Sequence, residues 1–336
     1  MVQAFYDIKI VCYHYTNMQN QFIFETMFGD DWIWYSILSA VLLGVAMSIY
    51  KLPSFTKKFE TAEPHKVIDA TALTLWSSIF MFMLSTLLFL PLILKRIHIG
   101  GHIDNQVIII ASVRGLFFVL ISYLQIKALS YAATNALFSL SSLASLSIVI
   151  LSGVIFFQES LNITQVIGLL LVLFVIGGFA WSNKGKKHII ITKVSVSMWL
   201  GIVTLSASGN LLNKIATMNK DIYTYQFILY FVIFLSSTFI FYKTHTDTSM
   251  KKVKLLHTRT ALVGLINGVF GFFGGWSLYT ALAHGPISIT QTINSCYILV
   301  TAVIAAIWMG ERQKLNKGIL ILICLTIIAL LLLRSK

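Results

Sequence analysis

One stretch of the chain occurs twice, and this repetition limits the possible folds more than any other feature of the sequence. The later copy covers residues 260–333 and the earlier copy covers about 107–182. Each copy contains three apolar runs of about 20 residues, the length that a helix needs to cross the hydrocarbon core of a membrane. In both copies a short joint separates the first two runs and an acidic joint precedes the third. The sequence therefore predicts a duplicated membrane protein.

The two copies also agree in register. They can be aligned by placing Lys127 on Thr280. In that alignment Glu159 of the earlier copy falls within one residue of Glu311 of the later copy. A match that keeps its joints and its acidic residue over about 40 positions is typical of an internal repeat.

Composition supports the membrane assignment. Hydrophobic residues make up 57% of the 336 residues and charged residues 11%, whereas a soluble domain carries about 25% charged residues. The chain has three cysteines without a CxxC pair, which excludes a zinc knuckle or a disulfide framework. The net charge of +13 lies in short loops between apolar runs, so it indicates contact with membrane lipids and not with nucleic acid.

The apolar runs predict an all-α integral membrane protein with ten transmembrane helices. A polar tail, 1–31, precedes the first half, 32–182, and a basic linker, 183–194, leads to the second half, 195–333. In the first half the runs cover about 32–50, 70–94, 106–126, 132–157 and 163–182. In the second half they cover about 195–213, 223–242, 260–282, 287–309 and 315–333. Because five is odd, the two halves enter the membrane in opposite senses, as in the inverted repeats of alternating-access transporters.

Short motifs occur in the same order in both halves. The second half contains Tyr279–Leu282, Gly310–Arg312 and Gly318, and the first half has the looser counterparts Ala128–Leu129, Glu159 and Gly168. Lys51 and Lys214 each end the first run of their half. This order and its duplication resemble the EamA-type repeat of the drug/metabolite transporter superfamily, over about 32–333.

The resemblance implies a secondary transporter of a small metabolite, such as an amino acid, a nucleotide derivative, a sugar or an amphipathic drug. It also implies a location in the plasma (cell inner) membrane. Family members usually have both termini in the cytoplasm. The loops disagree with this habit, because one membrane face carries 7 Lys and Arg and the other 17, and the positive-inside rule then places both termini outside. The orientation stays open, as does the oligomeric state.

Arg114 is the charged residue that lies deepest in an apolar run. It is about eight residues into its run, or roughly 12 Å at the helical rise of 1.5 Å per residue. An arginine at that depth costs at least ~2.5 kcal/mol and is a functional candidate by default. It either attracts a carboxylate or phosphate of the substrate, or extends to the lipid headgroups.

Polar side chains follow one face of two runs in the second half. The run 195–213 carries Ser206, Asn210 and Asn213, and the run 287–309 carries Gln291, Asn294 and Ser295. Each set either lines a substrate cavity or makes hydrogen bonds between helices, which contribute about 0.6 kcal/mol per pair. Asn267 and Trp276, in the run 260–282, are further candidates for the cavity.

Four glycines in the run 260–282 recur at intervals of four, three and four residues. They are Gly264, Gly268, Gly271 and Gly275. This spacing places all four on one face of a helix, where small residues let a neighbouring backbone approach closely. The sequence predicts helix packing for them.

The sequence favours a carrier over an enzyme. No segment outside the predicted spans exceeds about 30 residues, too few for a soluble catalytic domain, and no catalytic or metal-binding spacing is visible. We therefore expect no cofactor, and a small-molecule substrate bound in a central polar cavity. A lipid flippase of the same fold remains the main alternative. No Asp or Glu lies securely inside a run, so exchange or facilitated flux fits as well as proton coupling.

Overall fold

The fold was obtained as a computed structural model, which describes residues 32–49, 69–100, 102–128, 134–182, 193–218, 221–244, 258–308 and 317–334. Within these ranges all regular secondary structure is helical. The first half contributes α2 (Trp32–Ile49), α4 (Ala70–His98), α5 (Asn105–Ala128), α6 (Thr134–Phe156) and α7 (Ile163–Ser182). The second half contributes α8 (Lys193–Met218), α9 (Ile222–Thr244), α11 (Thr258–His284), α12 (Ile287–Ser295), α13 (Tyr297–Trp308) and α14 (Lys317–Leu333).

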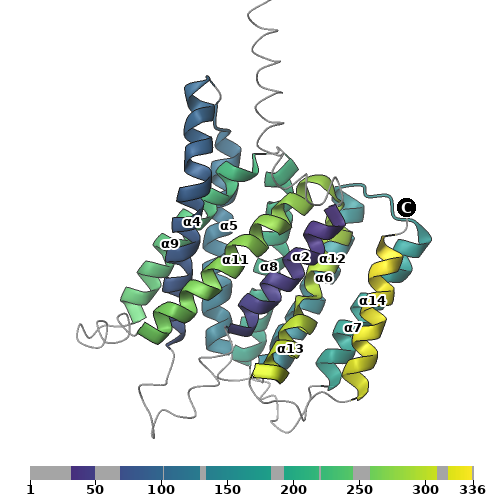
Figure 1. The fold of residues 1–336 in the computed structure, drawn as a ribbon. Helices are drawn as coiled ribbons and strands as arrows, with labels where there is room; N and C mark the ends of the chain where they lie inside the picture. Colours follow the sequence, from purple (N-terminus) through teal and green to yellow (C-terminus); the bar gives the residue numbers. More distant parts are fainter. Residues whose placement is uncertain are drawn as a thin grey trace, which may run out of the picture.

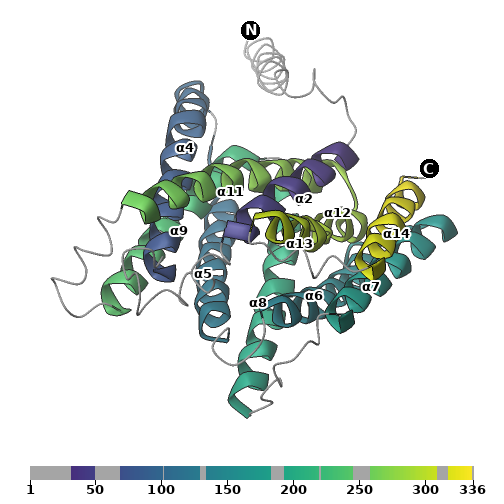
Figure 2. The same ribbon diagram turned by 60° about the horizontal axis from the view of Figure 1, so that its bottom comes forward.

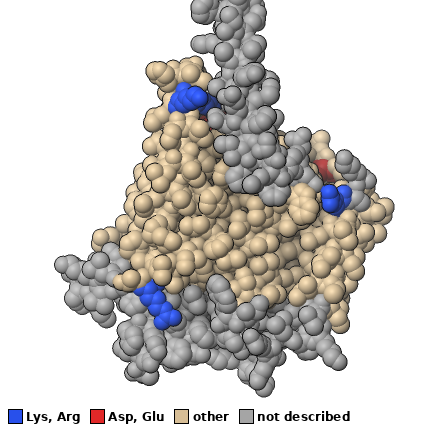
Figure 3. All heavy atoms as spheres, in the orientation of Figure 1, with Lys and Arg blue, Asp and Glu red and all other residues tan. Residues whose placement is uncertain are grey.

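The chain is an all-α, multi-pass membrane protein. In the described part of the chain, seven helical stretches are long and apolar enough to cross a membrane, counting α12 and α13 together, and α7 and α14 contain shorter apolar stretches. Figure 3 agrees with this, because the Lys, Arg, Asp and Glu atoms visible on that face lie toward its upper and lower edges. The band between them is uncharged, as a surface in contact with lipid tails must be.

The helices form two rows closed at both ends by a helix pair (Figures 1 and 2). One row consists of α11, α2 and α13, and the other of α5, α8 and α6. The pair α4 and α9 closes one end, and the pair α7 and α14 closes the other. Most of the extensive packing joins a helix of the first half to a helix of the second half.

Side-chain caps set the beginning of several helices. The Asp69 carboxylate accepts hydrogen bonds from the amides of Thr71 and Ala72 at 3.1 and 2.9 Å, where α4 begins. At the start of α7, Asn162 and Gln165 bond to each other's backbone amides at 2.7 and 3.1 Å. These bonds satisfy amide groups that the first turn of a helix leaves without a partner.

The run 287–309 contains one candidate membrane span, Ile287–Ile304, which is built from two helices. α12 ends at Ser295 and α13 begins at Tyr297. At the break the amide of Cys296 donates to the carbonyl of Ile293, 3.1 Å away, in the tighter pattern of a 3₁₀ turn. The Ser295 hydroxyl also donates to the carbonyl of Gln291 at 2.8 Å, a side-chain bond of the kind that bends helices. The counterpart α6 runs without interruption.

Three of the four aligned glycines of α11 face α4. Gly264 lies against Trp76, Gly268 against Phe80, and Gly271 against Met81. The fourth, Gly275, faces the hydroxyl of Tyr230 on α9.

We expect Gly268→Ala to destabilise the protein by about 1–3 kcal/mol, the usual cost of overpacking. An added Cβ would lie 2.8 Å from the Cβ of Phe80 and 2.9 Å from the backbone oxygen of Ser77, and the backbone of α4 cannot yield as a side-chain tip can. Gly177→Ala is the control, because its nearest neighbour would be 3.8 Å away. Thermal unfolding in detergent measures both. Equal unfolding temperatures for the two variants would contradict close packing at Gly268.

Candidate functional site

The charged residue deepest in the apolar runs, Arg114, is held against the second half of the chain. Its Nε donates a hydrogen bond to Oδ1 of Asn213 on α8 at 3.1 Å. The hydroxyl of Tyr225 on α9 donates to the same oxygen at 2.6 Å. Three helices, α5, α8 and α9, therefore meet through one amide oxygen, and Asn213 and Tyr225 are both buried.

The guanidinium of Arg114 lies flat against α8. A Cβ placed on Gly209 would be 3.0 Å from Cζ, Nε and Nη1 of Arg114, so a larger residue would push the guanidinium away from α8 by a few tenths of an ångström. On the other side the ring of Phe118 lies 5.9 Å from Cζ, within the range of a cation–π interaction. The side chain points at another helix, which is not the position of an arginine that extends to the headgroups.

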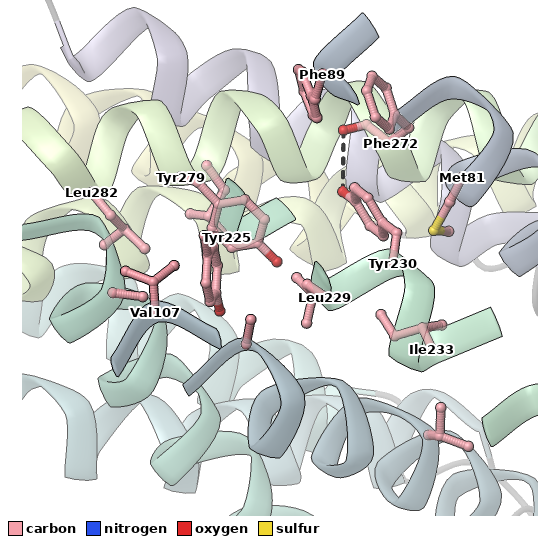
Figure 4. Close-up of a cluster of buried hydrophobic side chains, with 14 of the residues drawn as sticks. Met81, Phe89, Val107, Tyr225, Leu229, Tyr230, Ile233, Phe272, Tyr279 and Leu282 are labelled. Carbon is pink, nitrogen blue, oxygen red and sulfur yellow. Dashed lines mark hydrogen bonds between the residues drawn. The ribbon is translucent and has the colours of Figure 1, made fainter. Parts of the chain in front are cut away.

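One nitrogen of this guanidinium is buried and unused. Nη1 of Arg114 has no hydrogen-bond partner among the described residues. Tyr279, on α11, lies within electrostatic range of Arg114, and its ring meets that of Tyr225 edge-on with centroids 5.3 Å apart. Figure 4 shows these two rings in the apolar cluster between the rows.

The other candidates on α8 are less constrained. Ser206 and Asn210 are half-buried on the helix face that carries Asn213. Neither forms a side-chain hydrogen bond with the rest of the described chain. Packing of α8 against α5, α6 and α11 places this face in the interior of the bundle.

The candidates on α12 are buried, and two of them have polar partners. Asn294 accepts a hydrogen bond from the Ser39 hydroxyl on α2 at 2.9 Å, and Ser295 bonds within its own helix. Gln291 is 2% exposed, and its Nε2 lacks a partner among the described residues. An unpaired buried amide is costly, so Gln291 is the sequence candidate on α12 with a polar group free for a ligand; the buried Thr290 hydroxyl beside it also lacks a partner among the described residues.

Asn267 and Trp276 do not join the Arg114 group. The amide of Asn267 donates to the Ser77 hydroxyl at 2.8 Å, in the interface of α11 with α4. Trp276 belongs to an aromatic cluster, in which its ring lies 5.6 Å from that of Phe89 and 6.3 Å from that of Phe272. Figure 4 labels Phe89 and Phe272, where a dashed line marks the bond from the Tyr230 hydroxyl to the Phe272 carbonyl. Both contacts favour packing roles.

A second polar group holds the joint between α11 and α12. The carboxylate of Glu159, in the joint between α6 and α7, accepts hydrogen bonds from the amides of Ile287 and Ser288, the latter at 3.1 Å. From α8, Nζ of Lys214 donates to the carbonyls of Leu282 and Gly285, both at 2.8 Å. Glu159 therefore caps the start of α12. Because α8 continues to Met218, Lys214 lies within the helix, where it holds this joint. Lys51 and Glu311 lie outside the described residues.

Sequence reasoning missed three residues of the site: Gly209, Tyr225 and Tyr279. Gly209 precedes Asn213 by four residues, so it lies on the same helix face, and this spacing was the available signal. The two tyrosines lie in aromatic-rich helices where no polar period marks them. No group of three or more His, Cys, Asp or Glu able to hold a metal ion occurs in the part of the chain that the structure describes.

Comparison with known proteins identifies a fold but no family. No protein-family model and no curated protein matches the chain. Among solved structures 29 chains are similar. One of them, described as the crystal structure of a protein, has a TM-score of 0.59 at 13% identity, over 90% of this chain and 94% of that chain. A likeness at this identity concerns the fold, and function has to be argued from the site.

Proposed function

We propose that the protein is a secondary transporter, a permease or exporter that moves a small metabolite across the plasma membrane by alternating access. It is built from ten transmembrane helices as two inverted repeats of five and is a member of the EamA-type drug/metabolite transporters. The observation that carries the proposal is the pattern of helix packing. The most extensively packed helix pairs each have a counterpart when the two halves are exchanged.

The exchange can be followed pair by pair. If each helix is replaced by its counterpart five spans away, the packing of α2 on α11 becomes that of α8 on α5, which also occurs. The packing of α4 on α11 likewise becomes that of α9 on α5. The end pairs α4–α9 and α7–α14 are mapped onto themselves. A two-fold relation between halves lets one conformation open to one side of the membrane and its counterpart open to the other.

Polar groups between the halves support a substrate site near the two-fold axis that relates them. Asn213 and Arg114 come from different halves, as do Asn294 and Ser39. Buried polar contacts deep in a membrane protein are costly and mark substrate pathways. Nearly all of the described chain lies in long apolar helices, and no described segment forms a separate catalytic domain. This favours transport over catalysis.

Flux measurements test the proposal. Proteoliposomes that contain the full chain are expected to take up one class of labelled amino acids, nucleotides or sugars with saturable kinetics, with and without an imposed pH gradient. Rates that do not respond to the gradient would favour exchange or facilitated flux. Absence of any solute flux, together with scrambling of labelled phospholipid, would reject the transporter in favour of the flippase.

A further inference from the structure

We propose that Arg114 binds the anionic group of the transported solute, and hence that the substrate carries a carboxylate or a phosphate. This inference rests on the proposed transport function and narrows it. Arg114 is half-buried, and Nη1 of its guanidinium is buried without a partner among the described residues. The guanidinium is a permanent cation, and the buried part of a cation requires an anion or several acceptors. Among the described residues, Arg114 has one acceptor, the Asn213 oxygen.

No carboxylate in the described part of the chain is available to Arg114. Asp69 caps α4, and Asp104 accepts a bond from the amide of Gln106 at 2.8 Å. Asp221 forms an ion pair with Arg96 at 2.8 Å, and Glu159 caps α12. All four are therefore engaged elsewhere, and the counter-ion has to come from outside the described chain.

The free edge of the guanidinium is suited to a planar or tetrahedral anion. Its Nε is fixed on Asn213, and Gly209 lets the group lie flat on α8 with Nη1 buried and unpartnered. Arginine nitrogens in this arrangement bind carboxylate and phosphate in a bidentate manner. Tyr279 carries a further hydroxyl donor near this group, because its ring packs edge-on against Tyr225, which shares the Asn213 oxygen with Arg114.

The contacts of the guanidinium favour a solute over a lipid headgroup. Arg114 is the tenth residue of α5, and its guanidinium lies against Gly209 and Asn213 of α8. Asn213 is five residues from the end of α8 and Tyr225 is the fourth residue of α9. An anion therefore reaches the site from the end of the bundle where α8 and α9 meet, and it has to fit between helices to contact Nη1.

The test uses matched pairs of solutes that differ in charge. The full chain in phosphatidylcholine nanodiscs is heated with glutamate or glutamine, lactate or lactamide, and glycerol 3-phosphate or glycerol, at constant ionic strength. We expect at least one anion to raise the unfolding temperature of the wild type, and its neutral partner to leave it unchanged. Arg114→Gln is expected to weaken the binding of that anion by about thirtyfold or more.

Two further variants separate binding from folding. Gly209→Ala keeps every charge but displaces the guanidinium by a few tenths of an ångström, so it should weaken anion binding while the protein folds normally. Arg259→Gln removes an exposed arginine at the start of α11 and should bind the anion as the wild type does. Stabilisation by no anion, or stabilisation that persists in Arg114→Gln, overturns the inference. Stabilisation that requires phosphatidylglycerol in place of a solute also overturns it.

The same variants distinguish failure of this inference from failure of the proposed function. If a neutral solute shows saturable flux, and if that flux is the same in Arg114→Gln, the proposed transport function is supported and the anion site is rejected. Anion binding that depends on Arg114, without flux of that anion in proteoliposomes, would support the site and reject transport.

Discussion

Glu159→Ala is expected to destabilise the protein by about 2–4 kcal/mol, because two buried amides lose their acceptor at once. These amides belong to Ile287 and Ser288, which open α12 and are both fully buried. The negative charge is also lost from the positive end of the helix dipole.

The groups packed around the Glu159 carboxylate leave little scope for another side chain to replace it as the acceptor. Gly153 lies directly against the Ser288 hydroxyl and the Glu159 carboxylate, and the Glu159 amide donates to the Gly153 carbonyl at 3.2 Å. Just before it, Gln158 adopts a positive φ of 51°, an uncommon conformation for a residue other than glycine. The local backbone is therefore arranged to present this one carboxylate.

Thermal unfolding of the purified protein measures the effect. Glu159→Gln serves as the matched control, because its amide oxygen still accepts one of the two hydrogen bonds while the charge is removed, so its loss should be about half as large. If Glu159→Ala unfolds at the wild-type temperature, the cap contributes nothing and the joint is held by Lys214 alone.

The helices follow from the sequence because hydrophobic length alone determines them. A membrane requires apolar runs whose backbone groups are satisfied internally, and only helices meet that requirement within one segment. The run 163–182 therefore became α7 with the same bounds, and the run 32–50 contains α2, which is described over Trp32–Ile49. Polar ends are less determined: α8 extends five residues beyond its predicted end at 213, since Lys214 finds acceptors within the protein.

The break at Cys296 and the hydrogen-bond partners in the site could not be predicted from the sequence. Periodicity shows which residues share a helix face, and it correctly placed Ser206, Asn210 and Asn213 together. It does not show which helix lies opposite. The pairing of Arg114 with Asn213 joins positions 99 residues apart, and Asn267 bonds to Ser77 across 190 residues. Such contacts depend on how the two halves interlock.

Asn213→Leu is expected to have the second large effect, a loss of about 2–4 kcal/mol in stability. It removes the acceptor of two donors, and leaving either donor unpaired in the interior costs a similar free energy. Leucine has a similar volume, so packing changes little. Nε of Arg114 and the Tyr225 hydroxyl are then left without a partner in an apolar interior. Removing Tyr225 as well, in Asn213→Leu with Tyr225→Phe, should recover part of the loss, since one unpaired donor disappears.

Asn213→Asp is the informative counterpart, because it adds a charge at the same oxygen. The new carboxylate would lie about 3 Å from Nε and pair with the guanidinium as an internal counter-ion. We expect this variant to unfold at or above the wild-type temperature, while flux of an anionic solute falls because the substrate no longer finds a free cation. Thermal unfolding and proteoliposome flux, measured on the same preparation, separate the two effects. A variant that keeps wild-type flux of the anion would show that the solute does not compete for Arg114.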